Sequence, residues 1–269
     1  MVAVTAAAAV LVVAGRAAAV PGISVIQTSV PADSSSKKMV YPKCPQNTVP
    51  LGGGAEVDGG EAGVRLLSSG PADDGWVAWA REVIDGHDGS WSMRGWAICA
   101  PQPPGYQRVY SELEEGSAFA ASASVHCTGG RKVLGIGGAS VFGSARATLD
   151  TVKPLPDLTG VKVEVFAGPG EVTEPVAARA YAVCASPGLG LQMVSLSTPT
   201  SSSSYKTISV GCPPGTDPHG VSASLTGAMG GAHLDAMSVF SIGVYAEARE
   251  NPIGYRGSWK LDVIAICAM

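Results

Sequence analysis

Apolar and polar residues alternate along short segments of this chain, and Gly, Pro and Ser separate one segment from the next. Successive side chains of a β-strand point to opposite faces, so this period of two predicts short antiparallel strands and requires no helix. Over residues 91–99, one face would carry Trp91, Met93, Gly95, Ala97 and Cys99. The other face would carry Ser92, Arg94, Trp96 and Ile98. We expect the cysteine face to be core and the opposite face to be partly solvated.

The six cysteines indicate that the chain is built from three copies of one unit. They fall into three pairs whose members are 55, 57 and 55 residues apart: Cys44 and Cys99, Cys127 and Cys184, Cys212 and Cys267. Gly52, Gly135 and Gly220 each lie eight residues after the first cysteine of a pair. Self-similarity at a fixed period is typical of repeat architectures. The sequence therefore predicts an all-β protein of three tandem antiparallel β-sheet repeats, each of about 84 residues.

The repeats divide the chain into residues 20–100, 101–185 and 186–269. Short Pro-containing connectors at residues 101–104 and 186–187 join them. Two arrangements satisfy this division. If the repeats share one core, they form a pseudo-threefold β-prism; if each stands alone, they form a series of small sandwiches.

Residues 1–19 are typical of a secretory signal peptide. An apolar stretch at residues 6–14 is followed by three alanines at residues 17–19, which suit a signal peptidase site before Val20. The alternative is a membrane anchor, but the stretch is well short of the roughly 20 apolar residues that span a bilayer. We expect a secreted, extracellular protein with no membrane association after cleavage.

An exported chain with paired cysteines at constant spacing predicts one disulfide in each repeat: Cys44–Cys99, Cys127–Cys184 and Cys212–Cys267. A zinc or redox site would favour close C-x-x-C spacing, which the chain does not contain. The bridges are therefore expected to be structural.

Three short words recur through the repeats and resemble a known tandem repeat. They are residues 51–55 (LGGGA), 75–78 (GWVA) and 96–100 (WAICA). These words resemble a repeat of largely uncharacterised secreted proteins from high-GC Gram-positive bacteria, a likeness that implies export and repetition but no activity. A looser likeness, to threefold β-prism proteins such as vitelline membrane outer layer proteins and jacalin-like lectins, rests on internal symmetry alone.

Composition and motifs narrow the function classes. The chain has 46% hydrophobic and 15% charged residues, which excludes a disordered polar chain, and its net charge of −4 disfavours nucleic acid as a partner. It contains no H-E-x-x-H, G-x-S-x-G, P-loop or G-x-G-x-x-G word. We favour a non-catalytic protein without a cofactor, although a Ser-His-Asp triad can assemble from distant residues without any motif.

The loop at residues 85–89 (DGHDG) is a candidate calcium site, because it could present two carboxylates to the ion. An ordinary β-turn is the competing interpretation, since Asp-Gly pairs favour hairpin connections. The other two repeats place turn residues but no paired carboxylates nearby. We expect a turn and no metal site.

Comparison between repeats separates core aromatics from unexplained ones. Trp76 corresponds to valine in the other two repeats and is expected in the core, whereas Trp79 corresponds to Glu164 and Glu247 and is expected to face water. If a hairpin turn is centred on residues 86–87, Trp79 lies opposite Arg94 with Trp96 as its diagonal neighbour. Exposed indoles beside a guanidinium suit a sugar ring and its hydroxyls. The alternative is that these rings only cover the sheet or pack against an adjacent repeat.

These observations predict a secreted, non-catalytic binding module for cell-wall or environmental carbohydrate, with Trp79, Arg94 and Trp96 as candidate ligand-binding residues. The alternative is a structural or interaction protein of the extracellular envelope that binds no small molecule.

Overall fold

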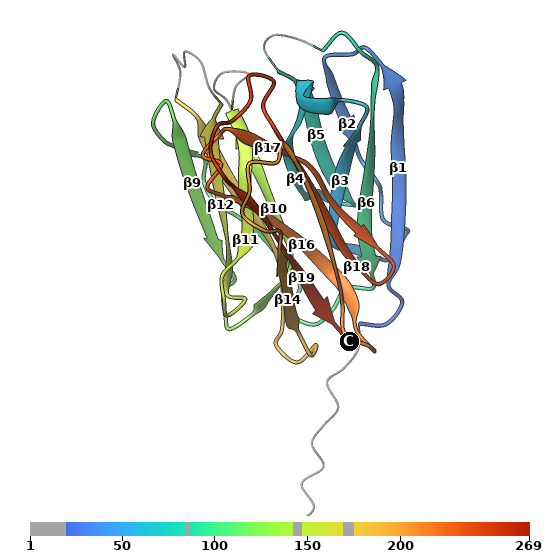
Figure 1. Ribbon diagram of the computed structural model, residues 1–269. Helices are drawn as coiled ribbons and strands as arrows, with labels where there is room; N and C mark the ends of the chain where they lie inside the picture. The colour runs from blue at the N-terminus through green and yellow to red at the C-terminus, as the bar shows by residue number, and fades with distance from the viewer. Residues whose placement is uncertain (1–19, 84–86, 142–146, 169–174) are drawn as a thin grey trace, which may run out of the picture.

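The computed structural model describes residues 20–83, 87–141, 147–168 and 175–269, so the predicted signal peptide at residues 1–19 lies outside the described residues. The described part is all-β, as predicted, and its only helical element is the 3₁₀ turn Glu61–Gly63. Its strands run together along the long direction of the molecule (Figure 1). No helix in the described ranges is long and apolar enough to cross a membrane.

Each repeat supplies two groups of three principal strands. Repeat 1 contains β1 (Ser24–Asp33), β2 (Lys37–Val40), β3 (Val49–Asp58), β4 (Val64–Pro71), β5 (Trp76–Glu82) and β6 (Trp91–Ala100). Repeat 2 contains β7 (Gln107–Tyr110), β8 (Glu114–Glu115), β9 (Ala120–His126), β10 (Lys132–Val141), β11 (Ala147–Pro154), β12 (Gly160–Ala167) and β13 (Ala177–Ala185). Repeat 3 contains β14 (Gln192–Ser197), β15 (Tyr205–Gly211), β16 (Asp217–Thr226), β17 (Ala232–Phe240), β18 (Gly243–Glu250) and β19 (Lys260–Ala268).

Every sheet is shared between two repeats. Sheet I has the order β1-β6-β3-β17-β18-β15 and joins repeats 1 and 3; sheet II has the order β2-β5-β4-β10-β13-β7, with β8 on β13, and joins repeats 1 and 2. Sheet III has the order β14-β19-β16-β11-β12-β9 and joins repeats 3 and 2. The buried apolar residues form one cluster with members from all three repeats. The repeats therefore form a β-prism around one core, and the serial-sandwich arrangement is not observed.

Within each sheet, the seam where a strand of one repeat pairs with a strand of another is narrow. In sheet I, β3 and β17 pair only through Glu56 with Ala236 and Ala55 with Met237. The β4–β10 and β11–β16 seams are also two residue pairs long. Within a repeat, by contrast, β3 pairs with β6 along its whole length. Hollows on the outer faces of sheets I and II span the β3–β17 and β4–β10 seams, with lining residues from both repeats.

The three repeated glycines meet where β3, β10 and β16 pack against one another. Each follows a register shift in its strand. A Cβ atom built at Gly52 would overlap the carbonyl oxygen of His219, and one built at Gly135 would overlap that of Leu51. A Cβ at Gly220 would lie 2.7 Å from the carbonyl oxygen of Leu134, which closes the cycle. Only glycine allows these backbones to approach so closely.

His219 stands where the other two repeats have Leu51 and Leu134, and all three side chains are buried. Its Nδ1 lies 2.9 Å from the carbonyl oxygen of Asp217, so Nδ1 donates that hydrogen bond. Burial lowers the pKa of His219, because the charged imidazolium loses its hydration there. Burial therefore favours the neutral form of this ring.

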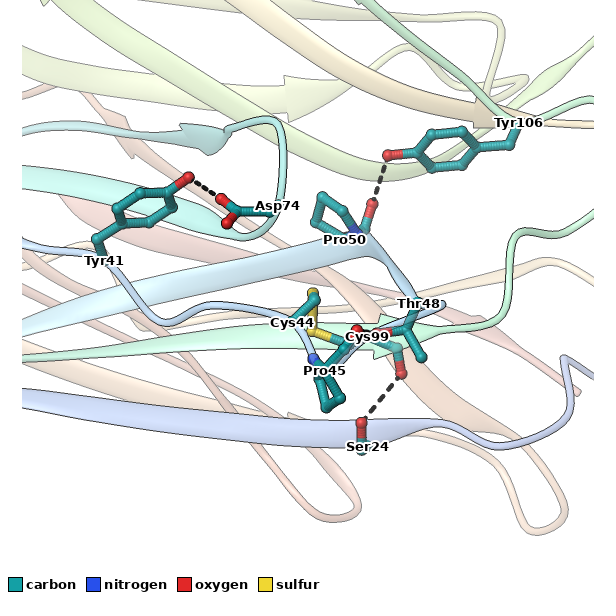
Figure 2. The surroundings of a disulfide bond; sticks show 9 residues. All are labelled: Ser24, Tyr41, Cys44, Pro45, Thr48, Pro50, Asp74, Cys99 and Tyr106. Atoms are coloured by element: carbon teal, nitrogen blue, oxygen red, sulfur yellow. Dashed lines mark hydrogen bonds between the residues drawn. A yellow bond between two sulfur atoms is a disulfide. The ribbon is translucent and has the colours of Figure 1, made fainter.

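The three predicted disulfides are confirmed: Cys44–Cys99, Cys127–Cys184 and Cys212–Cys267. Cys99 lies on β6 of sheet I, whereas Cys44 follows Lys43, which forms a bridge with Gly75 beside β5 of sheet II. The disulfide therefore ties two sheets together within one repeat. Figure 2 shows Tyr106 of repeat 2 donating its hydroxyl to the Pro50 carbonyl oxygen near this bridge, at 3.1 Å. Disulfides of this kind are typical of an oxidising compartment.

The predicted core face of β6 is confirmed, since Trp91, Met93, Gly95, Ala97 and Cys99 are all buried. On the opposite face, Arg94 and Trp96 are half-buried, as expected for a partly solvated surface. Ile98 departs from the prediction, because it is fully buried. Its Cδ1 lies beside Gly52, against which the His219 backbone of sheet III packs.

Candidate functional site

The predicted contact between Trp79 and Arg94 is wrong, because β5 and β6 do not form a hairpin. β5 pairs with β2 and β4 in sheet II, where Trp79 lies opposite Met39 and Ser68. β6 pairs with β1 and β3 in sheet I, where Arg94 lies opposite Ser29 and Glu56. The chain passes from one sheet to the next between these strands, so the two side chains lie on different faces of the prism.

The two tryptophans of β5 differ as their counterparts in the other repeats predict. Trp76 is 1% exposed, and its Nε1 donates to Ser69 Oγ at 2.8 Å, so its assignment to the core is confirmed. Trp79 is half-buried on the outer face, and the ammonium of Lys37 lies 4.4 Å from its ring centroid. Trp79 is thus accessible, although it is covered on one side by a lysine.

Trp96 and Arg94 do lie together, two residues apart on the outer face of β6. Trp96 lines an open hollow of about 600 Å³ that crosses from β1 to β18. Aromatic and polar side chains from repeats 1 and 3 complete its wall: Gln27, Glu56, Ser209, Ser238, Phe240 and Tyr245. The ring of Trp96 is therefore the member of the predicted trio that faces a cavity in sheet I.

The Arg94 guanidinium is paired with two neighbouring carboxylates. Its Nη2 donates to Glu56 Oε1 at 2.8 Å and lies 3.6 Å from Asp58 Oδ2. Burial raises the pKa of Glu56, and the charge of Arg94 opposes that rise. Arg94 thus holds the Glu56 carboxylate in place at the edge of the hollow, which leaves the carboxylate oxygens to accept further hydrogen bonds.

A second hollow, of about 230 Å³, adjoins the first on the same face and shares Glu56 with it. Its wall is acidic and includes Asp58, Asp235 and Glu247, together with Arg249. We call the two hollows together the sheet I groove. Carboxylates gather in it because repeats 1 and 3 each contribute acidic residues to one seam.

The buried carboxylate of Asp235 anchors this part of the groove. Arg249 donates from Nε to Asp235 Oδ2 at 2.8 Å, and His233 Nε2 lies 3.1 Å from Asp235 Oδ1. Burial raises the pKa of Asp235, although the charges of His233 and Arg249 oppose this rise. Arg249 also donates to Glu247 Oε1 at 2.9 Å, and Glu247 accepts the hydroxyl of Tyr245.

Sequence reasoning missed Asp235, although a signal for it exists. Asp235 and Asp150 occupy the same repeat position, 23 residues after the first cysteine, and each follows a buried leucine at a shift in strand register. A carboxylate kept in two copies of an otherwise apolar strand is unusual, because burying a charge is costly. Among the described residues, no group of three potential ligands is placed to hold a metal ion.

Replacing Asp150 with asparagine is expected to stabilise the protein at about pH 8 and to change little at about pH 4. Asp150 is buried in sheet III, which raises its pKa to about 7, and Thr151 donates to its Oδ1 at 3.0 Å. The unfolded chain loses this proton near pH 3.9, so the free energy of unfolding falls as the pH rises from about 4 to 7. Removing the charge should recover up to about 4 kcal/mol above that range.

Urea unfolding of wild type and Asp150→Asn at both pH values measures this difference. Asp88→Asn, at an exposed position, is the matched control and should change stability little at either pH. A gain for Asp150→Asn that is equal at both pH values would contradict the assignment.

The predicted loop at residues 85–89 is only partly described. Asp85 and Gly86 lie outside the described residues, so the choice of a turn over a calcium site stays a prediction.

Neither models of known protein families nor curated proteins match this sequence. The resemblance to secreted repeat proteins therefore stays a prediction that rests on the repeated words.

Proposed function

We propose that this protein is an exported, non-catalytic binding module that takes a carbohydrate in the sheet I groove. The observation that carries the proposal is the position of Trp96, whose ring faces a hollow with Phe240 and Tyr245 and with hydrogen-bonding side chains from both repeats. A sugar ring has an apolar face that stacks on aromatic rings and a rim of hydroxyls that needs polar partners. The groove offers both along one continuous surface.

The roles within this site differ from those that the sequence predicts. Trp96 stacks on the sugar, whereas Arg94 is a positioning residue that orients Glu56 through the 2.8 Å hydrogen bond. Glu56, Gln27 and Ser238 accept or donate hydrogen bonds to hydroxyls. Trp79 lies on another sheet and takes no part in this groove.

Export is supported by two independent features of the chain. Its described part contains three disulfides, which persist in oxidising compartments, and residues 1–19 are typical of a signal peptide. We therefore place the groove on an extracellular protein that meets cell-wall or environmental polysaccharide.

Replacing Trp96 with alanine is expected to weaken binding to an insoluble polysaccharide by about tenfold or more, because an aromatic side chain that the ligand covers contributes the largest part of such contacts. Co-sedimentation of the oxidised protein with chitin, cellulose and peptidoglycan measures the bound fraction. Phe119→Ala, which removes a 69% exposed aromatic side chain outside the groove, is the matched control and should bind as wild type does.

Equal binding by Trp96→Ala and wild type would reject the site. If the wild-type protein sediments with none of the three polymers, the carbohydrate assignment fails. The function would then be structural, in an extracellular envelope where the repeats bind no small molecule.

A further inference from the structure

Trp79 lines a separate hollow of about 320 Å³ on the outer face of sheet II. Its wall includes Lys37, Leu67, Arg81 and, from repeat 2, Tyr181. This volume falls at the lower end of the range of about 300–1,000 Å³ that small-ligand sites occupy. The hollow lies on a different sheet from the groove that Trp96 lines, so the two can be altered independently.

This hollow is the counterpart of the acidic hollow in sheet I, because equivalent repeat positions line both. Counted from the first cysteine of each repeat, Arg81 matches Arg249, Trp79 matches Glu247, Leu67 matches Asp235 and Lys37 matches Tyr205. The prism therefore holds the same cavity twice with different chemistry.

In sheet I the arginine of this cavity is neutralised by its own neighbours. Arg249 donates to Asp235 at 2.8 Å and to Glu247 at 2.9 Å. Burial disfavours its charged form, but these two carboxylates outweigh that effect and raise the pKa of Arg249. The cavity in sheet I thus carries its own counterions.

In sheet II the arginine is kept and both carboxylates are replaced. Leu67 and Trp79 occupy the repeat positions that Asp235 and Glu247 hold beside Arg249. Neither of these two side chains can neutralise Arg81. The Nε of Arg81 is buried and has no hydrogen-bond acceptor in the described part of the chain. Burial lowers the pKa of Arg81, because the charged guanidinium loses hydration there. A guanidinium in this setting favours an anionic partner.

Strand register adds a second cation to the same wall. Lys37 on β2 lies directly opposite Arg81 on β5, and like charges in this position repel each other. The Lys37 ammonium lies over the Trp79 ring, 4.4 Å from the centroid. Tyr181 approaches from β13 over Gly70, which leaves room for its ring. Two cations and two aromatic rings therefore converge on one hollow.

We infer that this hollow in sheet II binds the carboxylate-bearing ring of an acidic sugar, with Arg81 and Lys37 on the carboxylate and the ring against Trp79. A planar guanidinium can donate two parallel hydrogen bonds to a carboxylate, which gives this site its preference for that group. The assignment to a sugar rests on the proposed function, whereas the assignment to an anion rests only on the charges of this hollow.

Calorimetric titration of the oxidised protein with tetragalacturonate tests the inference. Two variants alter the hollow: Trp79→Glu introduces the residue that both other repeats carry, and Arg81→Gln removes the guanidinium charge. We expect each variant to bind about tenfold more weakly or worse, and we expect added salt to weaken wild-type binding. Lys162→Gln is the matched control, because Lys162 is a surface cation of sheet III already paired with Glu164 at 2.6 Å.

Circular dichroism and melting temperature establish that the variants fold. Wild-type affinity in both Trp79→Glu and Arg81→Gln would overturn the inference. Equal binding of a neutral tetrasaccharide would overturn its anionic part, and equal affinity for inorganic sulfate would overturn its sugar part. Co-sedimentation of Trp96→Ala with insoluble polysaccharide tests the sheet I groove, whereas titration of Arg81→Gln with tetragalacturonate tests this hollow, so a failure of the groove and a failure of the hollow give different results.

Discussion

Replacing Gly52 with alanine is expected to destabilise the whole protein by about 3 kcal/mol or more. The added Cβ would overlap the carbonyl oxygen of His219, a backbone atom of another repeat that no side-chain rotation can move. Relief requires β3 and β16 to separate where the strands of all three repeats pack together. Urea unfolding followed by tryptophan fluorescence measures the loss.

The three equivalent glycines should respond in a graded order. Overlap is deepest at Gly52, smaller at Gly135 and smallest at Gly220, where the Cβ would lie 2.7 Å from the nearest carbonyl oxygen. Gly211→Ala is the matched control, since its Cβ would meet only the Ile242 carbonyl oxygen at 3.6 Å, an ordinary contact. If Gly52→Ala were as stable as Gly211→Ala, the close approach of these strands would be rejected.

Removing the Cys44–Cys99 bridge by a double alanine substitution is expected to lower the free energy of unfolding by about 4 kcal/mol, from the entropy gained by the unfolded chain. The bridge closes a separation of 55 residues and joins β6 of sheet I to the segment beside β5 of sheet II. Because the repeats share one core, the variant should still unfold in a single transition at a lower urea concentration.

The equivalent substitutions at Cys127 with Cys184, and at Cys212 with Cys267, serve as parallel measurements, because these separations of 57 and 55 residues predict similar losses. Loss of repeat 1 alone in a separate early transition would contradict the shared core. A loss below about 1 kcal/mol would show that the bridge constrains the unfolded chain far less than its separation predicts.

Local periodicity and repetition predicted much of this molecule correctly. The alternation over residues 91–99 identified the core face of β6, because side-chain direction in a strand depends only on position along it. The cysteine spacing identified all three disulfides, because a pairing that is repeated three times leaves little choice of partner. The replacement of Trp76 by valine in the other repeats identified a core position.

Pairing between strands could not be predicted in the same way. A short connection between two strands usually forms a hairpin, which led to the expected contact of Trp79 with Arg94. Here the chain crosses to another sheet instead, and β3 pairs with β17, a strand of repeat 3. Such distant partners are selected by the burial of one common core, which no local pattern records.

The sequence by itself determined the strand content, the threefold repetition and the disulfides of this protein, because these depend on periodicity and spacing along the chain. Only the tertiary structure decided which side chains share a cavity, because each sheet combines two repeats across a seam of two residue pairs. It placed Trp96 with side chains of repeat 3, and it left Arg81 without the carboxylates that neutralise Arg249. Charge and shape at these seams arise from contacts between repeats.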